Sequence, residues 1–219
     1  MTRQISGRRI TDPPERRITN LMRATRVGRL ISAIAFAALA ACAPKDAPIH
    51  GVVMHDPAAA APLIVARPGG APYVLAADTG RFVLLYFGYT HCPDYCPMML
   101  TDWMRVKRDL GPLGDRVRFV FVSVDPERDA PEATAAYAVG FDSSFVGLAP
   151  ARPELDVIQK AWGVTSYKEV SNSPGRSADS YGVAHPAHAF LVNRAGRLQA
   201  LYPPETRWQD VAADLRKLF

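Results

Sequence analysis

Two kinds of hydrophobic pattern alternate along the chain from residue 82 onward. Residues 82–87 and 117–124 are nearly continuous apolar runs rich in β-branched and aromatic side chains, which is typical of strands covered on both faces of a sheet. Between these runs, Cys96, Leu100 and Trp103 recur at positions i, i+4 and i+7, which predicts the buried face of a helix. The sequence Asp-Leu-Gly that ends at Gly111 is expected to end this helix.

Further helices are expected later in the chain, over residues 131–140 and 153–162. A last helix is predicted to begin at Thr206, where Thr-Arg-Trp-Gln matches the pattern of a capping box. It would direct three apolar residues inward: Val211, Leu215 and Leu218.

Two apolar runs near the C-terminus flank a turn sequence. Residues 187–192 and 197–202 lie on either side of Asn-Arg-Ala-Gly at 193–196, which predicts a β-hairpin. Strand, helix, strand, helix, hairpin and final helix together predict an α/β fold with a mixed sheet flanked by helices. Because a cysteine pair occurs at the first junction from strand to helix, the expected fold is thioredoxin-like.

The composition is that of an ordinary globular domain with appendages, since the 219 residues are 48% hydrophobic and 21% charged. The formal net charge of +5 is unevenly distributed. Residues 1–29 hold eight arginines and two acidic residues, a net charge of +6, so the remainder carries about −1. The folded part therefore lacks the basic surface that binds nucleic acid, and no nucleic-acid partner is expected.

The basic tail leads into an apolar run at 30–41 that ends in Leu-Ala-Ala before Cys42. A charged segment, a short apolar segment and a small-residue site are the parts of a secretory signal, whereas a helix that crosses a bilayer needs about 20 apolar residues. The segment resembles a bacterial lipoprotein signal, which would make Cys42 the lipidated first residue of the mature chain. The alternatives are an uncleaved membrane anchor and a Cys42 that is free or disulfide-bonded. A start at Met22 would give a signal of ordinary length.

Three parts of the chain are therefore expected. Residues 1–42 would be an N-terminal extension and signal segment, residues 43–70 a flexible tether rich in alanine and proline, and residues 71–219 the folded domain. Nothing indicates an obligate oligomer, so a monomer is expected. The lipid anchor would hold the domain at the periplasmic side of a membrane of the bacterial cell envelope, where disulfides can form.

The other two of the three cysteines, Cys92 and Cys96, lie in Phe-Gly-Tyr-Thr-His-Cys-Pro-Asp-Tyr-Cys-Pro at 87–97. Pro93 and Pro97 suit the start of a helix and the loop before it, which places Cys92 at or just before a helix N-terminus that lowers a thiol pKa. Side chains four residues apart on a helix have Cβ atoms about 5–6 Å apart, so the sulfurs can close a disulfide or converge on a metal. The CxxxC spacing favours a metal, and two thiolates select Cu(I), with Zn(II) as a competitor.

A third ligand would be a histidine, and the chain has five: His50, His55, His91, His185 and His188. The first two fall in the expected tether and are predicted to be solvated, and the third is expected to point away from the sulfurs. His185 and His188 precede the strand of the predicted hairpin, and in thioredoxin-like folds the loop entering that strand faces the helix of the active site. Position alone does not choose between them, although alternation places His188 on the same face as Phe190 and favours a packed side chain.

Four stretches of the sequence carry a resemblance to a known family. They are the motif at 87–97, Val-Ser-Val-Asp-Pro-Glu-Arg-Asp at 122–129, Phe-Asp-Ser-Ser-Phe-Val-Gly-Leu at 141–148, and Tyr-Gly-Val-Ala-His at 181–185 followed by Phe-Leu-Val. With these motifs in order from about residue 73 to the C-terminus, the chain resembles the Sco/SenC family of copper-binding assembly proteins. The resemblance implies a thioredoxin-like fold that binds a copper ion through Cys92, Cys96 and His185.

The resemblance also implies a function. The family helps to deliver copper to the binuclear copper site of cytochrome c oxidase, or to reduce the cysteines of that site, so the copper-site subunit of the oxidase is the expected partner. A metal-independent thiol–disulfide reductase is the alternative, in which Cys92 attacks a client disulfide and Cys96 resolves the mixed disulfide. A redox-sensing or peroxidase-like protein is a third hypothesis. His185 discriminates among them, because a dithiol reductase has little need of an imidazole there.

One position departs from the family pattern, in which the ligand histidine follows Val-Asp and not Val-Ala as here. A carboxylate in place of Ala184 could orient the imidazole of His185 or contact a partner, so its absence bears on the strength of copper binding and on the identity of the client. His188 could in addition complete a four-ligand zinc site with His185 and the two cysteines.

Several other residues have two open interpretations. Asp125 and Asp129 would form either an acidic docking loop near the metal or a turn that precedes a helix. Met98 and Met99 could supply copper with thioether ligands, although methionines beside a helical stripe more often pack against the core. Two tryptophans are expected in the core: Trp103 and Trp162.

Overall fold

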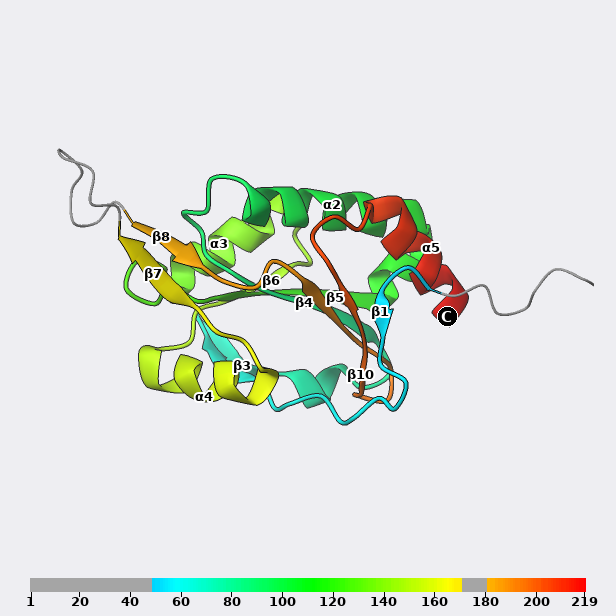
Figure 1. Cartoon of the computed structure of the whole chain (residues 1–219), viewed down its shortest axis with the longest axis horizontal. Coiled ribbons are helices and arrows are strands. Elements are labelled where there is room, and N and C mark those ends of the chain that lie inside the picture. The colour runs from blue at the N-terminus through cyan, green and yellow to red at the C-terminus, as the bar shows by residue number, and fades with distance from the viewer. Residues whose placement is uncertain (1–48, 171–180) are drawn as a thin grey trace, which may run out of the picture. The chain divides into compact units, whose positions relative to one another are not determined.

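The computed structural model describes residues 49–170 and 181–219 (Figure 1). The expected lipidation site Cys42, the signal segment and the alternative start at Met22 lie outside these residues. None of the helices in the described part of the chain combines the length and the apolar composition needed to cross a bilayer.

A mixed sheet of six strands lies at the centre of the described domain, in the order β1-β10-β9-β4-β5-β6. The strands are β1 (Val52–Val53), β4 (Phe82–Gly88), β5 (Val117–Ser123), β6 (Val146–Leu148), β9 (Ala189–Val192) and β10 (Leu198–Tyr202). Strands β4, β5 and β6 are parallel, while β9 pairs antiparallel with β4 on its other side. Every residue of β4 is buried, as its continuous apolar sequence predicts.

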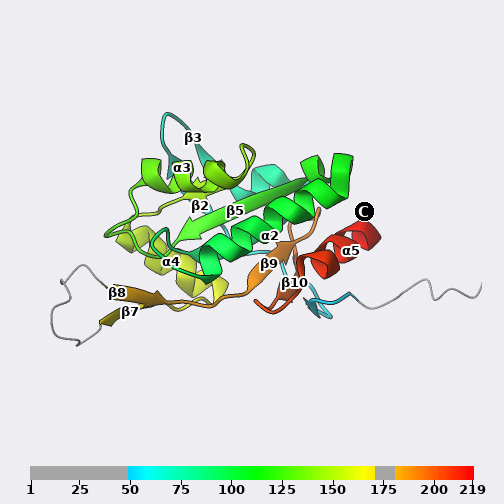
Figure 2. The ribbon, with the colours of Figure 1, turned by 90° about the horizontal axis from the view of Figure 1, so that it is seen from above.

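Four helices of the described domain cover the two faces of this sheet. They are α2 (Tyr95–Leu110), α3 (Pro131–Phe141), α4 (Arg152–Trp162) and α5 (Trp208–Leu218), with short 3-10 helices η1 (Leu75–Asp78) and η2 (Gly111–Arg116). Helices α2, α3 and α5 lie over one face and α4 over the other (Figure 1), and α2 runs beside α5 (Figure 2). The helical stripe of Cys96, Leu100 and Trp103 is buried, and Trp162 is also in the core. The predicted α/β fold with a mixed sheet flanked by helices is therefore confirmed.

The last helix begins later than expected. Helix α5 starts at Trp208, and the side chain of its N-cap residue, Arg207, makes no capping hydrogen bond within the described structure. The backbone N–H of Thr206 instead donates a hydrogen bond to the carbonyl of Pro203, 3.0 Å away, so Thr206 belongs to the turn that follows β10. The predicted capping box is therefore wrong, and the first turn of α5 is supported by an ion pair between Arg207 and Asp210.

The folded domain begins earlier than the sequence suggests, since residues 49–70 of the expected tether already belong to it. Strand β1 pairs with β10, and a hairpin of β2 (Ile64–Arg67) and β3 (Gly70–Val74) follows. His50 is exposed, as predicted, but it is also tied to the fold, because its backbone N–H and its ring Nδ1 lie 2.6 and 2.8 Å from the buried carboxylate of Asp214. His55 is exposed, as expected.

A second hairpin, which the hydrophobic pattern does not predict, projects from one end of the sheet (Figures 1 and 2). It consists of β7 (Tyr167–Val170) and β8 (Tyr181–Ala184), which pair only with each other among the described strands. Strand β8 ends directly before His185. This hairpin therefore brings a histidine from late in the chain to the end of β4 where the cysteine motif begins.

Candidate metal centre

The cysteine pair lies where β4 gives way to α2. Residues 89–94 form the turn between them and carry Cys92, while Cys96 occupies the first turn of α2. Cys92 is half-buried and Cys96 is fully buried, and both are free thiols. Cys92 lies three positions before the first helical residue, so it is just ahead of the helix N-terminus, as the positions of the prolines suggest.

Gly88, the last residue of β4, makes room for the buried sulfur. A Cβ atom at this position would lie 2.7 Å from Sγ of Cys96, and 2.8 Å from ring atoms of Phe121 and Tyr86. Real Cβ atoms do not approach sulfur so closely, so any larger residue would displace the cysteine. The glycine of the motif is therefore required by close packing against Cys96.

His185 completes a cluster with the two cysteines. Its ring nitrogen and the two sulfurs lie within 4.8 Å of one another, and no other group of three or more His, Cys, Asp or Glu side chains in the described residues comes together in this way. Nε2 of His185 lies 3.7 Å from Sγ of Cys96. The rings of Tyr86 and Tyr89 meet the imidazole edge to face, with centroids 5.8 and 5.7 Å away.

The orientation of the imidazole follows from its other nitrogen. Nδ1 of His185 lies 3.1 Å from the carbonyl oxygen of Pro186. Because a carbonyl only accepts hydrogen bonds, Nδ1 carries a proton, so in the neutral imidazole it is Nε2 that has the free lone pair. That lone pair faces the buried sulfur of Cys96, which is the arrangement that a metal ligand requires.

The two cysteines differ in protonation. A hydrogen bond from Cys96 lowers the pKa of Cys92 to about 5, and backbone N–H groups of Cys96 and Asp94 act in the same direction against the effect of burial. The hydrogen bond shared with Cys92, together with burial, raises the pKa of Cys96. At neutral pH the metal-free site therefore holds one thiolate, Cys92, and one thiol, Cys96.

The other candidate histidines lie outside the cluster. His91 is exposed, and its Nδ1 lies 3.1 Å from the hydroxyl of Thr90 and 3.3 Å from the carboxylate of Asp129. His188 is half-buried, and its ring packs edge to face on Phe190 with centroids 4.7 Å apart. The packed state expected for His188 is confirmed in part, and the four-ligand zinc site does not form in the described structure because His188 is not in the cluster.

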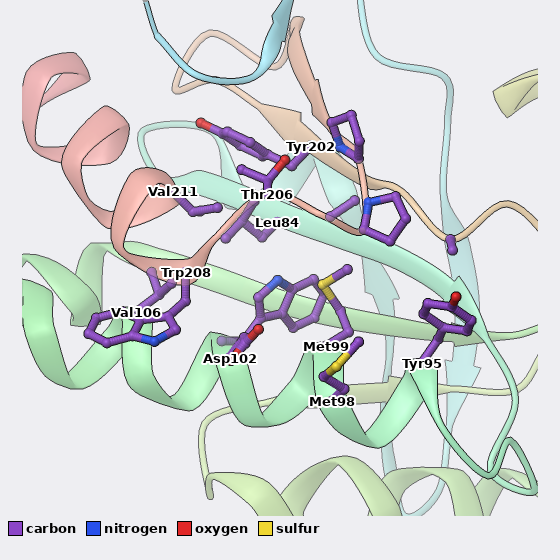
Figure 3. Close-up of a pocket in the computed structure, with 15 residues that line it drawn as sticks. Leu84, Tyr95, Met98, Met99, Asp102, Val106, Tyr202, Thr206, Trp208 and Val211 are labelled. Carbon is purple, nitrogen blue, oxygen red and sulfur yellow. The ribbon is translucent and has the colours of Figure 1, made fainter.

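The methionines after the motif line a separate pocket between α2 and α5. Figure 3 shows Met98 and Met99 beside Tyr95, with Trp208 and Val211 of α5 on the far side. Met99 is partly buried and packs against the core, whereas 49% of the surface of Met98 is exposed. Packing is therefore the better interpretation for Met99.

The two aspartates of the 122–129 stretch are each only 1% exposed. Because a docking loop must present its charges to a partner, the burial of Asp125 and Asp129 contradicts the docking interpretation and favours the other one, a turn that precedes helix α3. Sequence reasoning also missed Tyr86, whose hydroxyl lies 3.8 Å from the sulfur of Cys96. A tyrosine in an otherwise apolar strand is the available signal, because a buried hydroxyl needs a polar partner.

Residues 70–219 match the SCO1/SenC family model. The chain belongs to the SCO1/SenC family. It is 30% identical to human "Protein SCO1 homolog, mitochondrial" over 158 residues, which are 67% of this chain and 51% of that protein. It is 33% identical to "Protein sco1" of Schizosaccharomyces pombe over 135 residues, 61% of this chain and 50% of that protein. This family member thus spans about half the length of the curated relatives that it matches.

Solved structures of Sco proteins have the same fold. The solution structure of apo Sco1 from Thermus thermophilus is 36% identical with a TM-score of 0.69, and the match covers 78% of this chain and 98% of that one. The structure of Bradyrhizobium japonicum ScoI with copper bound is 30% identical with a TM-score of 0.65, and the match covers 74% of this chain and 100% of that one. The thioredoxin-like fold expected for this SCO1/SenC protein is therefore confirmed.

Proposed function

We propose that this protein binds copper through Cys92, Cys96 and His185 and acts in the assembly of cytochrome c oxidase. The observation that carries the proposal is the convergence of two sulfurs and one imidazole nitrogen within 4.8 Å. Thiolates with an imidazole form a donor set suited to copper. The likeness of this chain to a ScoI protein solved with copper bound supports the same choice of metal.

The protonation of the three side chains fits a copper cargo. Cys92 is already a thiolate because its pKa is lowered to about 5, and Nε2 is the nitrogen with the free lone pair in the neutral imidazole of His185, because Nδ1 donates to Pro186. Only Cys96, whose pKa is raised, has to lose a proton on binding, since thiols ligate metals as thiolates. Binding at neutral pH is therefore expected to release about one proton per copper ion.

The membrane anchor and the client extend this proposal. Cys42, as a lipidated N-terminal residue, would tether the domain at the periplasmic face of a membrane, and copper would pass by ligand exchange to the binuclear copper site in the oxidase subunit. Cys42→Ser is expected to release the protein from membranes. Unchanged membrane association of this variant would favour an uncleaved apolar anchor.

A second candidate function is the reduction of client disulfides, which the unequal pKa values of the cysteines favour. The thiolate of Cys92 would attack one sulfur of a client disulfide, form a mixed disulfide and release the other client sulfur as a thiolate. Cys96 would then lose its proton and attack Cys92, which closes the Cys92–Cys96 disulfide and releases the second client thiolate. The client gains two electrons and the cysteine pair loses two.

Anaerobic titration of the reduced protein with Cu(I) against a competing chelator distinguishes the two functions. The wild type is expected to bind one equivalent tightly, and Cys92→Ser and His185→Ala are each expected to weaken binding at least about tenfold, because each removes a ligand. His188→Ala is the matched histidine control and should keep the wild-type affinity. Weak binding that is the same with and without His185 would leave disulfide reduction as the leading function.

A further inference from the structure

The loop between β5 and α3 contains two buried carboxylates, Asp125 and Asp129, each 1% exposed. Burial of an ionised carboxylate is costly unless hydrogen bonds or an opposite charge compensate for the lost water. The partners of these two groups therefore show what the loop holds together.

Asp129 holds the turn that carries Cys92. Its carboxylate accepts hydrogen bonds from the backbone N–H and the hydroxyl of Thr90, at 2.9 and 2.6 Å. It also accepts from the hydroxyl of Ser123, the last residue of β5, at 2.6 Å. Because Thr90 lies two positions before Cys92, these bonds fix the cysteine turn to the end of a central strand.

Asp125 holds the strand that carries His185. Its carboxylate accepts hydrogen bonds from the hydroxyl of Tyr181 at 2.7 Å and from Nε of Arg128 at 2.5 Å. Arg128 also donates to the backbone carbonyl of Tyr181 at 3.0 Å, and its guanidinium carbon lies 3.6 Å from the centre of the Tyr181 ring. Tyr181 is the first residue of β8, and His185 follows the last.

The two carboxylates are joined through Ser123. Its hydroxyl donates to Asp129, and the same oxygen accepts from the backbone N–H of Asp125 at 3.1 Å. Strand β8 pairs with β7 and with no strand of the central sheet among the described residues. Side-chain contacts such as those of Asp125 and Arg128 therefore fix its position relative to the cysteine turn.

We infer that residues 125–129 position the metal centre: Asp129 sets the place of Cys92, and Asp125 sets the place of His185. Neither aspartate is a metal ligand. The loop acts by holding the cysteine turn and the segment that carries His185 in register with each other, and Cys96 and His185, which meet there, are 89 residues apart in the chain. The expected effect on copper affinity rests on the proposed copper function. The positions of the Cys92 and His185 side chains can also be tested without metal.

A double-mutant cycle separates positioning from general stability. Asp125→Asn is expected to weaken Cu(I) binding at least about tenfold, the size typical of groups that orient a ligand. In a His185→Ala background the same substitution should have little further effect, because the ligand that Asp125 positions is already gone. Asp129→Asn should weaken binding in both backgrounds, since the cysteines remain. Equal losses from Asp125→Asn with and without His185 would overturn the inference.

Asp214→Asn is the matched control. Asp214 is also a buried carboxylate that accepts backbone hydrogen bonds, from His50 and Gly51, but it lies on α5. This variant should lower the unfolding temperature as the other two do while leaving copper affinity within about twofold, since it holds no ligand segment. A loss of affinity equal to that of Asp125→Asn would show that binding simply follows stability and would contradict positioning.

Two measurements keep the test decisive if a variant fails to fold or the wild type fails to bind copper. Tyr181→Phe keeps the ring that stacks on Arg128 and removes only the hydroxyl bonded to Asp125, so it is expected to fold and to weaken copper binding in the same His185-dependent manner. In the metal-free protein, Asp125→Asn and Tyr181→Phe should shift the ¹⁵N ring resonances of His185, and Asp214→Asn should not. Ring resonances unchanged in every variant would refute the positioning role even if the protein binds copper, while shifted resonances without copper binding would refute only the proposed function.

Discussion

The hydroxyl of Tyr86 lies 3.8 Å from the sulfur of Cys96, and both side chains are fully buried. The Tyr86 ring also packs edge to face on Trp103, with centroids 6.3 Å apart, and on His185. One residue of the central strand therefore contacts both the buried cysteine and the histidine. Hydrogen bonds to a cysteine sulfur are one of the means by which proteins tune redox potentials.

Tyr86→Phe is expected to lower the reduction potential of the Cys92–Cys96 couple. The tyrosine O–H stabilises the reduced sulfur more than a disulfide sulfur, which is a weak acceptor, so its removal favours the oxidised state. A net hydrogen bond of about 0.5–1.5 kcal/mol corresponds to about 10–30 mV for a two-electron couple. Equilibration with glutathione redox buffers measures the shift.

Tyr137→Phe is the control for this prediction. The hydroxyl of Tyr137 is buried and has no hydrogen-bond partner among residues 49–170 and 181–219, and its ring packs on Phe121. Removal of this hydroxyl should leave the potential unchanged. The same potential in wild type and Tyr86→Phe would show that the contact with Cys96 carries no energy.

Cys92 in the metal-free, reduced protein is expected to react as a thiolate down to unusually low pH. Because Cys96 donates a hydrogen bond to it, the pKa of Cys92 is lowered to about 5, so the rate of alkylation by iodoacetamide should be half-maximal near that pH. Cys96, buried and with a raised pKa, should stay unmodified up to about pH 9. Mass spectrometry of the alkylated peptides distinguishes the two sites. In Cys96→Ala the midpoint for Cys92 should move upward, and an unchanged midpoint would show that Cys96 is not the cause.

The same pKa shift predicts a dependence of stability on pH. The pKa of Cys92 is lower in the folded protein than in the unfolded chain, where it is about 8.5, so the unfolded chain binds more protons between these values. The stability that Cys92 contributes is therefore complete above about pH 9 and is lost as the pH falls toward 5. Urea unfolding of metal-free wild type and Cys92→Ser over this range should show a smaller rise with pH in the variant.

Gly88→Ala is expected to disrupt the metal centre from the strand side. The added methyl group would lie 2.7 Å from the sulfur of Cys96, and overpacking of a close-packed core costs about 1–3 kcal/mol. Copper affinity should fall together with stability, because the ligand Cys96 is displaced. Gly140→Ala is the control, since the space around Gly140 in α3 is open and alanine in a helix is favoured over glycine by about 0.5–1 kcal/mol. Wild-type stability and copper affinity in Gly88→Ala would contradict the packing argument.

The parts of the fold that the sequence predicts are those with a strong local pattern. Strands β4 and β5 are long and nearly continuously apolar, and α2 has a helical stripe, so both kinds of element could be placed within a few residues. Strand β1 has two residues and β8 reads Tyr-Gly-Val-Ala. Both segments are too short and too mixed to show the alternation of a strand or the repeat of a helix. Their positions depend on contacts with partners distant in sequence, such as that between His50 and Asp214.

The residues of the candidate site were likewise only partly predictable from the sequence. The spacing of Cys92 and Cys96 predicts their proximity because residues four apart at a helix start lie close together, although Cys92 lies in the turn before α2 and only Cys96 lies within the helix. The choice of His185 over His188 came from a family resemblance, since only the paired hairpin shows which imidazole reaches the sulfurs. The burial of Asp125 and Asp129 could not be predicted either, because an acidic turn has the same sequence pattern whether its partners are water or the side chains of Thr90 and Tyr181.

His188→Ala is expected to reduce stability without affecting copper. The half-buried ring packs on Phe190 with centroids 4.7 Å apart, and loss of such a contact costs about 0.5–1.5 kcal/mol. Burial lowers the pKa of His188, so the unfolded chain takes up its proton first and the wild type loses stability as the pH falls below about 6.5. Urea unfolding at pH 5 and pH 7 should show a smaller difference in the variant. Weakened copper binding with intact stability would instead make His188 a ligand.

Ala184→Asp tests whether the missing family carboxylate weakens the site. In this chain the proton on Nδ1 of His185 already has an acceptor, the carbonyl of Pro186 at 3.1 Å, so the tautomer and the direction of Nε2 are set without a neighbouring acid. Loss of a group that orients a ligand typically costs about 10–100-fold in metal affinity. Because the backbone supplies that group here, restoring the carboxylate should change Cu(I) affinity by less than about threefold. Ala184→Asn controls for the added volume without the charge. A gain of tenfold or more with aspartate, but not with asparagine, would show that the imidazole is poorly held in the natural sequence and that a negative charge beside the ligand is what strengthens copper binding.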